Sequence, residues 1–280
     1  MQRLNHSGHA TRTLFLLAAM TAIASAQAAP TFLNPLVTTL LIEASAVNGV
    51  GVHRNVLGTG PISDAASEMF GLSTADSSAS VDALGLRAAA SVHNASVDGH
   101  SAGAHSGAGI VNPFYLVARA GYTATTASIQ IDYHLGGALN DTPGCPSCFE
   151  FIQADLGVGG MTDQFHFLGF HSMATAGNPN GNVTGVNMGG ALRGLVPLNT
   201  ELYLRAALYT GASCQGFSTT CDASGLFGNS LRYYGFSSDA VDIVWGLAPA
   251  ALPGAVPEPP TALLMGLGLG LLWWLRRQQQ

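Results

Sequence analysis

The chain lacks lysine altogether and holds few charged residues of any kind. Charged residues make up 9% of its 280 positions, about a third of the usual share. All ten basic residues are Arg, and between residues 29 and 255 six of them stand against 15 Asp and Glu, a formal charge of −9. Because such a surface repels a phosphate backbone, we expect no nucleic-acid partner.

Long apolar runs are missing as well. No stretch reaches the roughly 18 residues that a membrane-spanning helix needs. The mean hydropathy of +0.29 comes from two apolar segments near the ends of the chain, and the hydrophobic residues between them occur in short runs. This pattern excludes a polytopic membrane protein and predicts one soluble body at residues 29–255.

Motifs for metal-dependent hydrolysis and for calcium binding are also missing. The sequence has neither a His-Glu-x-x-His segment nor an Asp-x-Asp-x-Asp-Gly loop. Asp98, His100 and Ser101 combine three catalytic residue types, but a catalytic triad is built from distant segments, so their adjacency does not indicate one. We therefore predict no catalytic residue, no metal site and no cofactor.

The N-terminal segment has the order of a secretory signal. Two arginines precede an apolar run at residues 13–23, and small residues follow that run. Signal peptidase needs small side chains at the third and first positions before its cut, which Ala26 and Ala28 supply. We predict a signal peptide at residues 1–28, cleaved by signal peptidase after Ala28, with cleavage after Ala26 as the second choice.

The C-terminal segment is a short apolar stretch closed by basic residues. Residues 261–275 carry no charge, and Arg276 and Arg277 follow them. A helix of this length spans about 22 Å, less than a bilayer core of about 30 Å, which suits a transient anchor better than a permanent one. Under the positive-inside rule the arginines stay cytoplasmic, so the body lies on the far side of the inner membrane.

A short motif before this helix completes the tail. Its residues are Val256, Pro257, Glu258 and Pro259. Together with the apolar helix and the arginine pair, they resemble the PEP-CTERM sorting signal of Gram-negative bacteria over residues 256–280. The resemblance implies that exosortase, a membrane-embedded processing enzyme, recognises the tail, and that the protein reaches the cell surface or extracellular matrix. It also implies an association with exopolysaccharide and biofilm.

The body shows the patterns of β-strands. Polar and apolar residues alternate in several segments, and clusters of Gly, Asn and Pro separate them as turns, with Gly136 and Gly137 as one such turn. The strand candidates are residues 128–135, 149–156, 164–170, 200–208 and 240–245. We predict a mainly β body, an antiparallel β-sandwich or jelly roll, between the signal peptide and the C-terminal membrane helix.

The first part of the body has a weaker pattern. Residues 30–110 are rich in Ala, Ser, Gly and Val, which fits either weak strands or loose loops. Residues 100–109 consist mostly of Gly, Ala and Ser, so they are a candidate flexible linker between two halves. No change of composition marks a boundary there, and we predict a single domain.

Cysteine is scarce. Cys145 and Cys148 lie in an apparent turn, and Cys214 and Cys221 form a second close pair in the sequence. An even number of cysteines in an exported protein favours disulfides. We predict that Cys145 pairs with Cys148 and Cys214 with Cys221, each closing a local loop, although four cysteines allow three connectivities. A zinc site and a thiol redox motif are the alternatives.

Two further groups of side chains bear on binding. His100 and His105 lie in the small-residue run and could bind a metal adventitiously, but solvated histidines are the commoner outcome. Tyr233, Tyr234 and Phe236 could line a platform on which sugar rings stack, although core packing explains such residues equally well.

Taken together, these features predict a noncatalytic exported protein of the cell surface or matrix with a disulfide-stapled β-rich body. One alternative is a carbohydrate-binding module that engages exopolysaccharide. A secreted hydrolase of unrecognised type is the third hypothesis.

Overall fold

A computed structural model of the chain describes residues 31–95, 98–142, 145, 147–160, 168–176, 184–216, 220–237 and 239–248. The chain divides into two compact units, residues 1–33 and 34–280. Only residues 31–33 of the first unit are described, and every described β-strand belongs to the second. The predicted signal peptide, the sorting motif, the C-terminal helix and Arg276 and Arg277 lie outside the described residues.

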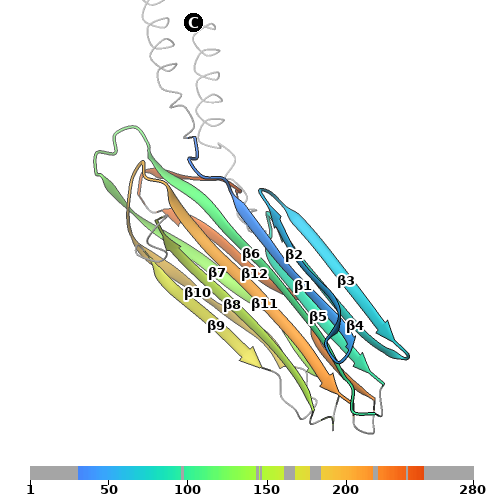
Figure 1. Cartoon of the computed structure of the whole chain (residues 1–280). Helices are drawn as coiled ribbons and strands as arrows, with labels where there is room; N and C mark the ends of the chain where they lie inside the picture. The colour runs from blue at the N-terminus through green and yellow to red at the C-terminus, as the bar shows by residue number, and fades with distance from the viewer. Residues whose placement is uncertain are drawn as a thin grey trace, which may run out of the picture. The chain divides into compact units, whose positions relative to one another are not determined.

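The second unit is built from two antiparallel sheets whose long strands run side by side (Figure 1). One sheet contains β2 (Val50–Gly58), β1 (Val37–Val47), β6 (Ser101–Ala118), β11 (Leu202–Gln215), β8 (Cys148–Gly159) and β9 (Gly169–Ala176) in that order, with β13 (Val241–Trp245) also paired to β6. The other contains β10 (Thr184–Pro197), β7 (Thr126–Asp141), β12 (Cys221–Ser237), β5 (Gly85–Asn94), β4 (Ser73–Asp82) and β3 (Ile62–Phe70). The predicted mainly β, antiparallel sandwich is confirmed.

Alternate residues of these strands form the core between the two sheets. In β1, Leu40, Ile42 and Ala44 are buried while the residues between them are partly exposed, as the two-residue period of a strand requires. Two buried serines connect the sheets, because the Ser77 hydroxyl donates to the backbone carbonyl of His105 and the Ser106 hydroxyl to that of Ala89. Buried hydroxyl groups thus find backbone acceptors across the core.

Four of the predicted strands are observed. Residues 128–135 lie within β7, 149–156 within β8, most of 200–208 within β11, and most of 240–245 within β13. The remaining candidate, residues 164–170, reaches the described part of the chain only at its end, where β9 begins at Gly169. Among the described residues no helix is long and apolar enough to cross a membrane.

Two expectations about the small-residue segments are wrong. The candidate linker at residues 100–109 is almost entirely part of β6, which pairs with β1, β11 and β13. Of the two possibilities for the segment before it, weak strands or loose loops, the strands are confirmed, because it supplies β1 to β5. Gly136 and Gly137 are not a turn but lie inside β7, paired with β10. Cross-strand neighbours hold these small residues in strands that their own propensity does not specify.

The sandwich has a terminal end and a distal end. Asn34, near the start of the described chain, donates to Glu201, and Leu247, near its finish, exchanges hydrogen bonds with Asn112. Both contacts lie where β11 begins and β6 approaches its last residues. The start of β6 and the end of β11 therefore mark the distal end.

Candidate functional site

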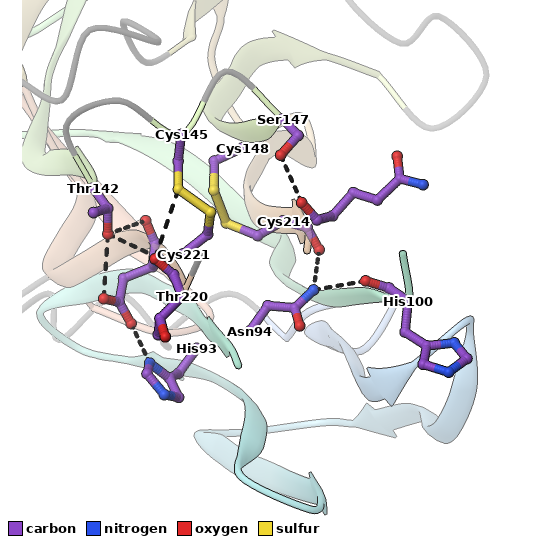
Figure 2. Close-up of a disulfide and its surroundings, with 12 residues drawn as sticks. His93, Asn94, His100, Thr142, Cys145, Ser147, Cys148, Cys214, Thr220 and Cys221 are labelled. Atoms are coloured by element: carbon purple, nitrogen blue, oxygen red, sulfur yellow. Dashed lines mark hydrogen bonds and ion pairs between the residues drawn. A yellow bond between two sulfur atoms is a disulfide. The ribbon is translucent and has the colours of Figure 1, made fainter. Parts of the chain in front are cut away.

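Two disulfides lie at the distal end of the sandwich (Figure 2). Cys145 is bonded to Cys221 with a Cα–Cα distance of 6.0 Å, and Cys148 to Cys214 with one of 4.1 Å. Two of the connections between the sheets lie here, one from β7 to β8 and one from β11 to β12. The disulfides therefore fasten one crossing to the other.

The predicted formation of disulfides is confirmed, but the predicted pairing is wrong. Cys148 and Cys214 are direct cross-strand partners in the register of β8 and β11. Cys214 and Cys221, by contrast, belong to different sheets, and packed sheets stand about 10 Å apart, farther than the usual Cα separation in a disulfide. The disulfide connectivity therefore follows the register of the paired strands rather than the closeness of the cysteines in the sequence.

Polar contacts surround the disulfides. The Asn94 side chain is buried and donates to the backbone carbonyls of His100 and Cys214, at 2.8 and 2.9 Å. Asp222 contacts His93 at 2.5 Å and also interacts with Thr142 (Figure 2). These bonds join β5, β12 and the β7–β8 crossing into one cross-linked region.

Three of the cysteines lie close enough together to bear on the alternative hypothesis of a zinc site. The sulfur atoms of Cys145, Cys148 and Cys221 all lie within 4.8 Å of one another, close enough to share a metal ion. All the described cysteines are in disulfides, however, and zinc is bound by thiolates. In this oxidised form the cluster is a structural cross-link.

The outer face of the seven-stranded sheet carries three neighbouring aromatic side chains, Phe149, Phe151 and Tyr209, which we call the ring patch. Phe149 is 53% exposed and Tyr209 39% exposed. A Cβ added to Gly107 would meet ring atoms of Tyr209 at 2.7 Å, and one added to Gly211 would collide with the Phe151 ring. Both rings therefore lie close over glycines of the neighbouring strands.

Polar side chains border the ring patch on the β1 and β2 side. Glu43 lies between His53 and His105, and the His105 ring meets that of Phe151 edge-on with centroids 6.0 Å apart. A depression of about 230 Å³ beside Tyr209 is lined in part by Thr39 and Asn55. Exposed rings next to hydrogen-bonding groups are suited to contact a flat, hydroxylated ligand.

The platform predicted from Tyr233, Tyr234 and Phe236 is not formed. Tyr233 is 7% exposed and faces the core, where its ring lies near Trp245 and where burial raises the pKa of its hydroxyl to about 12. Tyr234 and Phe236 alternate with it along β12, and Phe236 is 45% exposed. Successive residues of a strand point to opposite faces, so the three rings cannot form one surface.

Residues 99–103 match the Gly-x-Ser-x-Gly pattern of serine hydrolases. That motif places its serine on a sharp turn between a strand and a helix. Here Ser101 is the first residue of β6, and its backbone amide donates to the Asn48 side chain. Because a strand follows Ser101, the nucleophile elbow is not formed.

The two histidines of this segment have separate surroundings. His100 contacts the Asn48 side chain at 2.7 Å and the edge of Phe70. His105 instead faces Glu43 and Phe151. They do not share a site. The contacts of His105 with residues of β1 and β8 depend on strand order and register and have no signal in the local sequence.

Comparisons with known proteins identify no family. No protein-family model matches the chain, and no curated protein matches it. Among solved structures, a chain in the structure of infectious bursal disease virus Gx strain is 10% identical, with 86% of this chain and 70% of that chain covered and a TM-score of 0.17. At that score the likeness supports no conclusion about function.

Proposed function

We propose that this chain is a noncatalytic protein exported across the inner membrane and sorted through its PEP-CTERM-like tail to the cell surface or extracellular matrix. The proposal assigns residues 29–255 as the delivered body and residues 256–280 as the part that exosortase processes. The sandwich then serves as a stable module outside the cell.

The observation that carries the proposal is the pair of disulfides joining the two sheet crossings. Disulfides persist in oxidising compartments and are rare in the cytosol. They lie at the distal end, whereas Asn34 and Leu247, near the two limits of the described second unit, make their contacts at the terminal end. A body cross-linked in this way is suited to remain folded in an oxidising compartment outside the cytosol.

The tail is tested by substituting its recognised residues. In a strain that encodes an exosortase, Glu258→Ala or removal of Arg276 and Arg277 is expected to leave the protein in the inner membrane, because recognition and orientation both depend on the tail. Fractionation and immunoblotting measure the distribution. Asp242→Ala is the matched control, since it removes an exposed carboxylate of the body. Surface delivery unchanged by the tail variants contradicts the proposal.

A second candidate function is binding of a neutral polysaccharide by the ring patch. The exposure of Phe149 and Tyr209 on one sheet face supports it, because pyranose faces stack on exposed aromatic rings. The formal charge of −9 between residues 29 and 255 disfavours polyanionic glycans and favours neutral ones.

This second candidate is tested by retention on matrix polysaccharides. Tyr209→Ala and Phe149→Ala are each expected to lower the affinity about three- to tenfold, the loss of one stacking contact. Affinity electrophoresis in gels containing each polymer measures this. Phe236→Ala removes a similarly exposed ring from the other sheet and is the matched control. Equal losses in all three variants, or no retention on any neutral polymer, exclude the ring patch as the binding surface.

A further inference from the structure

Two histidines approach one carboxylate from opposite sides on the outer face of the seven-stranded sheet. The Nδ1 atom of His53 lies 2.5 Å from Oε1 of Glu43, and the Nδ1 atom of His105 lies 3.8 Å from Oε2 of the same residue. These three side chains, which we call the His-Glu-His row, come from β2, β1 and β6. Glu43 and His53 face each other across the hairpin of β1 and β2, and His105 comes from a later part of the sequence.

Strand register holds the row in place. Glu43 is the direct partner of His53 in the pairing of β1 with β2, and the direct partner of His105 in the pairing of β1 with β6. Directly opposed side chains on one face of a sheet have Cβ atoms about 5 Å apart. The two histidines are therefore both within reach of one point above the central glutamate.

The surroundings of the row leave room for a ligand. A depression of about 290 Å³ contains all three side chains and is otherwise lined by small residues, Gly49, Gly51 and Gly103 among them. The side chains of His53 and His105 are 59% and 48% exposed. On the side of the depression only small residues and Val52 stand beside them, so the imidazole rings can turn there toward a common ligand, while Phe151 borders His105 on the other side.

We propose that His53, Glu43 and His105 bind a divalent transition-metal ion of the zinc class. Imidazole nitrogen and carboxylate oxygen are the ligand types that zinc takes up together, and three protein ligands leave a fourth position for water. The metal takes neutral imidazole and ionised carboxylate as ligands, so its binding replaces the contact between His53 and Glu43. The site is independent of both the sorting tail and the disulfides.

The proposal is tested by titrating the purified, oxidised protein with zinc chloride after any free thiol has been blocked with iodoacetamide. Isothermal calorimetry is expected to show one zinc ion bound per chain, and excess EDTA is expected to remove it. His53→Ala, His105→Ala and Glu43→Gln are each expected to raise the dissociation constant about tenfold or more. These exposed substitutions leave the core intact, which circular dichroism verifies.

His93→Ala is the matched control, because His93 also contacts a carboxylate, Asp222, at 2.5 Å but has no second histidine opposite it among the described contacts. It is expected to leave zinc binding unchanged. An absence of zinc binding overturns the proposal. So does a dissociation constant that any of the three row variants leaves unchanged, or one that His93→Ala raises as much as they do.

Discussion

Replacing Cys148 and Cys214 together by alanine is expected to lower the free energy of unfolding by about 4 kcal/mol. The disulfide closes a loop with a sequence separation of 66 residues, and chain-entropy models assign a cross-link of this span about that effect. Since whole domains are stable by only about 5–15 kcal/mol, removing this cross-link takes away a large part of the stability of the body. Urea unfolding followed by tryptophan fluorescence measures it.

Cys145→Ala with Cys221→Ala is the matched pair for this experiment. Its disulfide spans 76 residues, so its removal alone is expected to have a similar effect. The two losses are not expected to add, because both bonds fasten the same two crossings and share most of their loops. A loss below about 1 kcal/mol from either pair would show that the crossings are held without the cross-links.

Gly85→Ala is expected to cost about 3 kcal/mol or more of stability. Gly85 follows the turn between β4 and β5 at a φ of 121°, in a region that alanine rarely adopts. An added Cβ would also collide with the backbone carbonyl oxygen of Leu231 in β12. Because backbone atoms cannot move aside as a side chain does, the substitution disturbs both the hairpin and its neighbouring strand. Thermal unfolding of the purified variant measures the loss.

Gly71→Ala separates conformational strain from collision. Gly71 also has a positive φ, 61°, but an added Cβ meets nothing within 4 Å. Only the strain of the left-handed conformation applies there, about 1 kcal/mol. Equal losses at the two positions would contradict the close contact between Gly85 and β12.

The sequence predicted the fold class because several strands alternate strongly. The segment at residues 128–135 sets Ile129, Ile131 and Leu135 on one face, and all three are buried. The small-residue strands carried no such signal. Ala and Gly have low strand propensity, so residues 100–109 were predicted to be a linker. In the structure they lie in β6, which pairs with β11 and with β1 or β13. Pairing partners, which the local sequence does not specify, stabilise it.

The candidate sites depend on register in the same way. Cys148 faces Cys214 and Glu43 faces His105 through strand pairings that join distant segments, while Glu43 faces His53 across the β1–β2 hairpin. Alternation alone indicates which residues share a face of one strand, and it could have separated Tyr233 from its neighbours in β12. It does not indicate which strand lies alongside, so these clusters were not predictable without the sheet order.

The most direct test of the proposed role is non-reducing peptide mapping of the protein recovered from outside the producing cells. We expect peptides linked through Cys145–Cys221 and Cys148–Cys214, an N-terminus at residue 29 and no peptide from residues 261–280. Recovery of the chain only inside the cell, with free thiols and with both terminal segments intact, would contradict the proposed export and sorting.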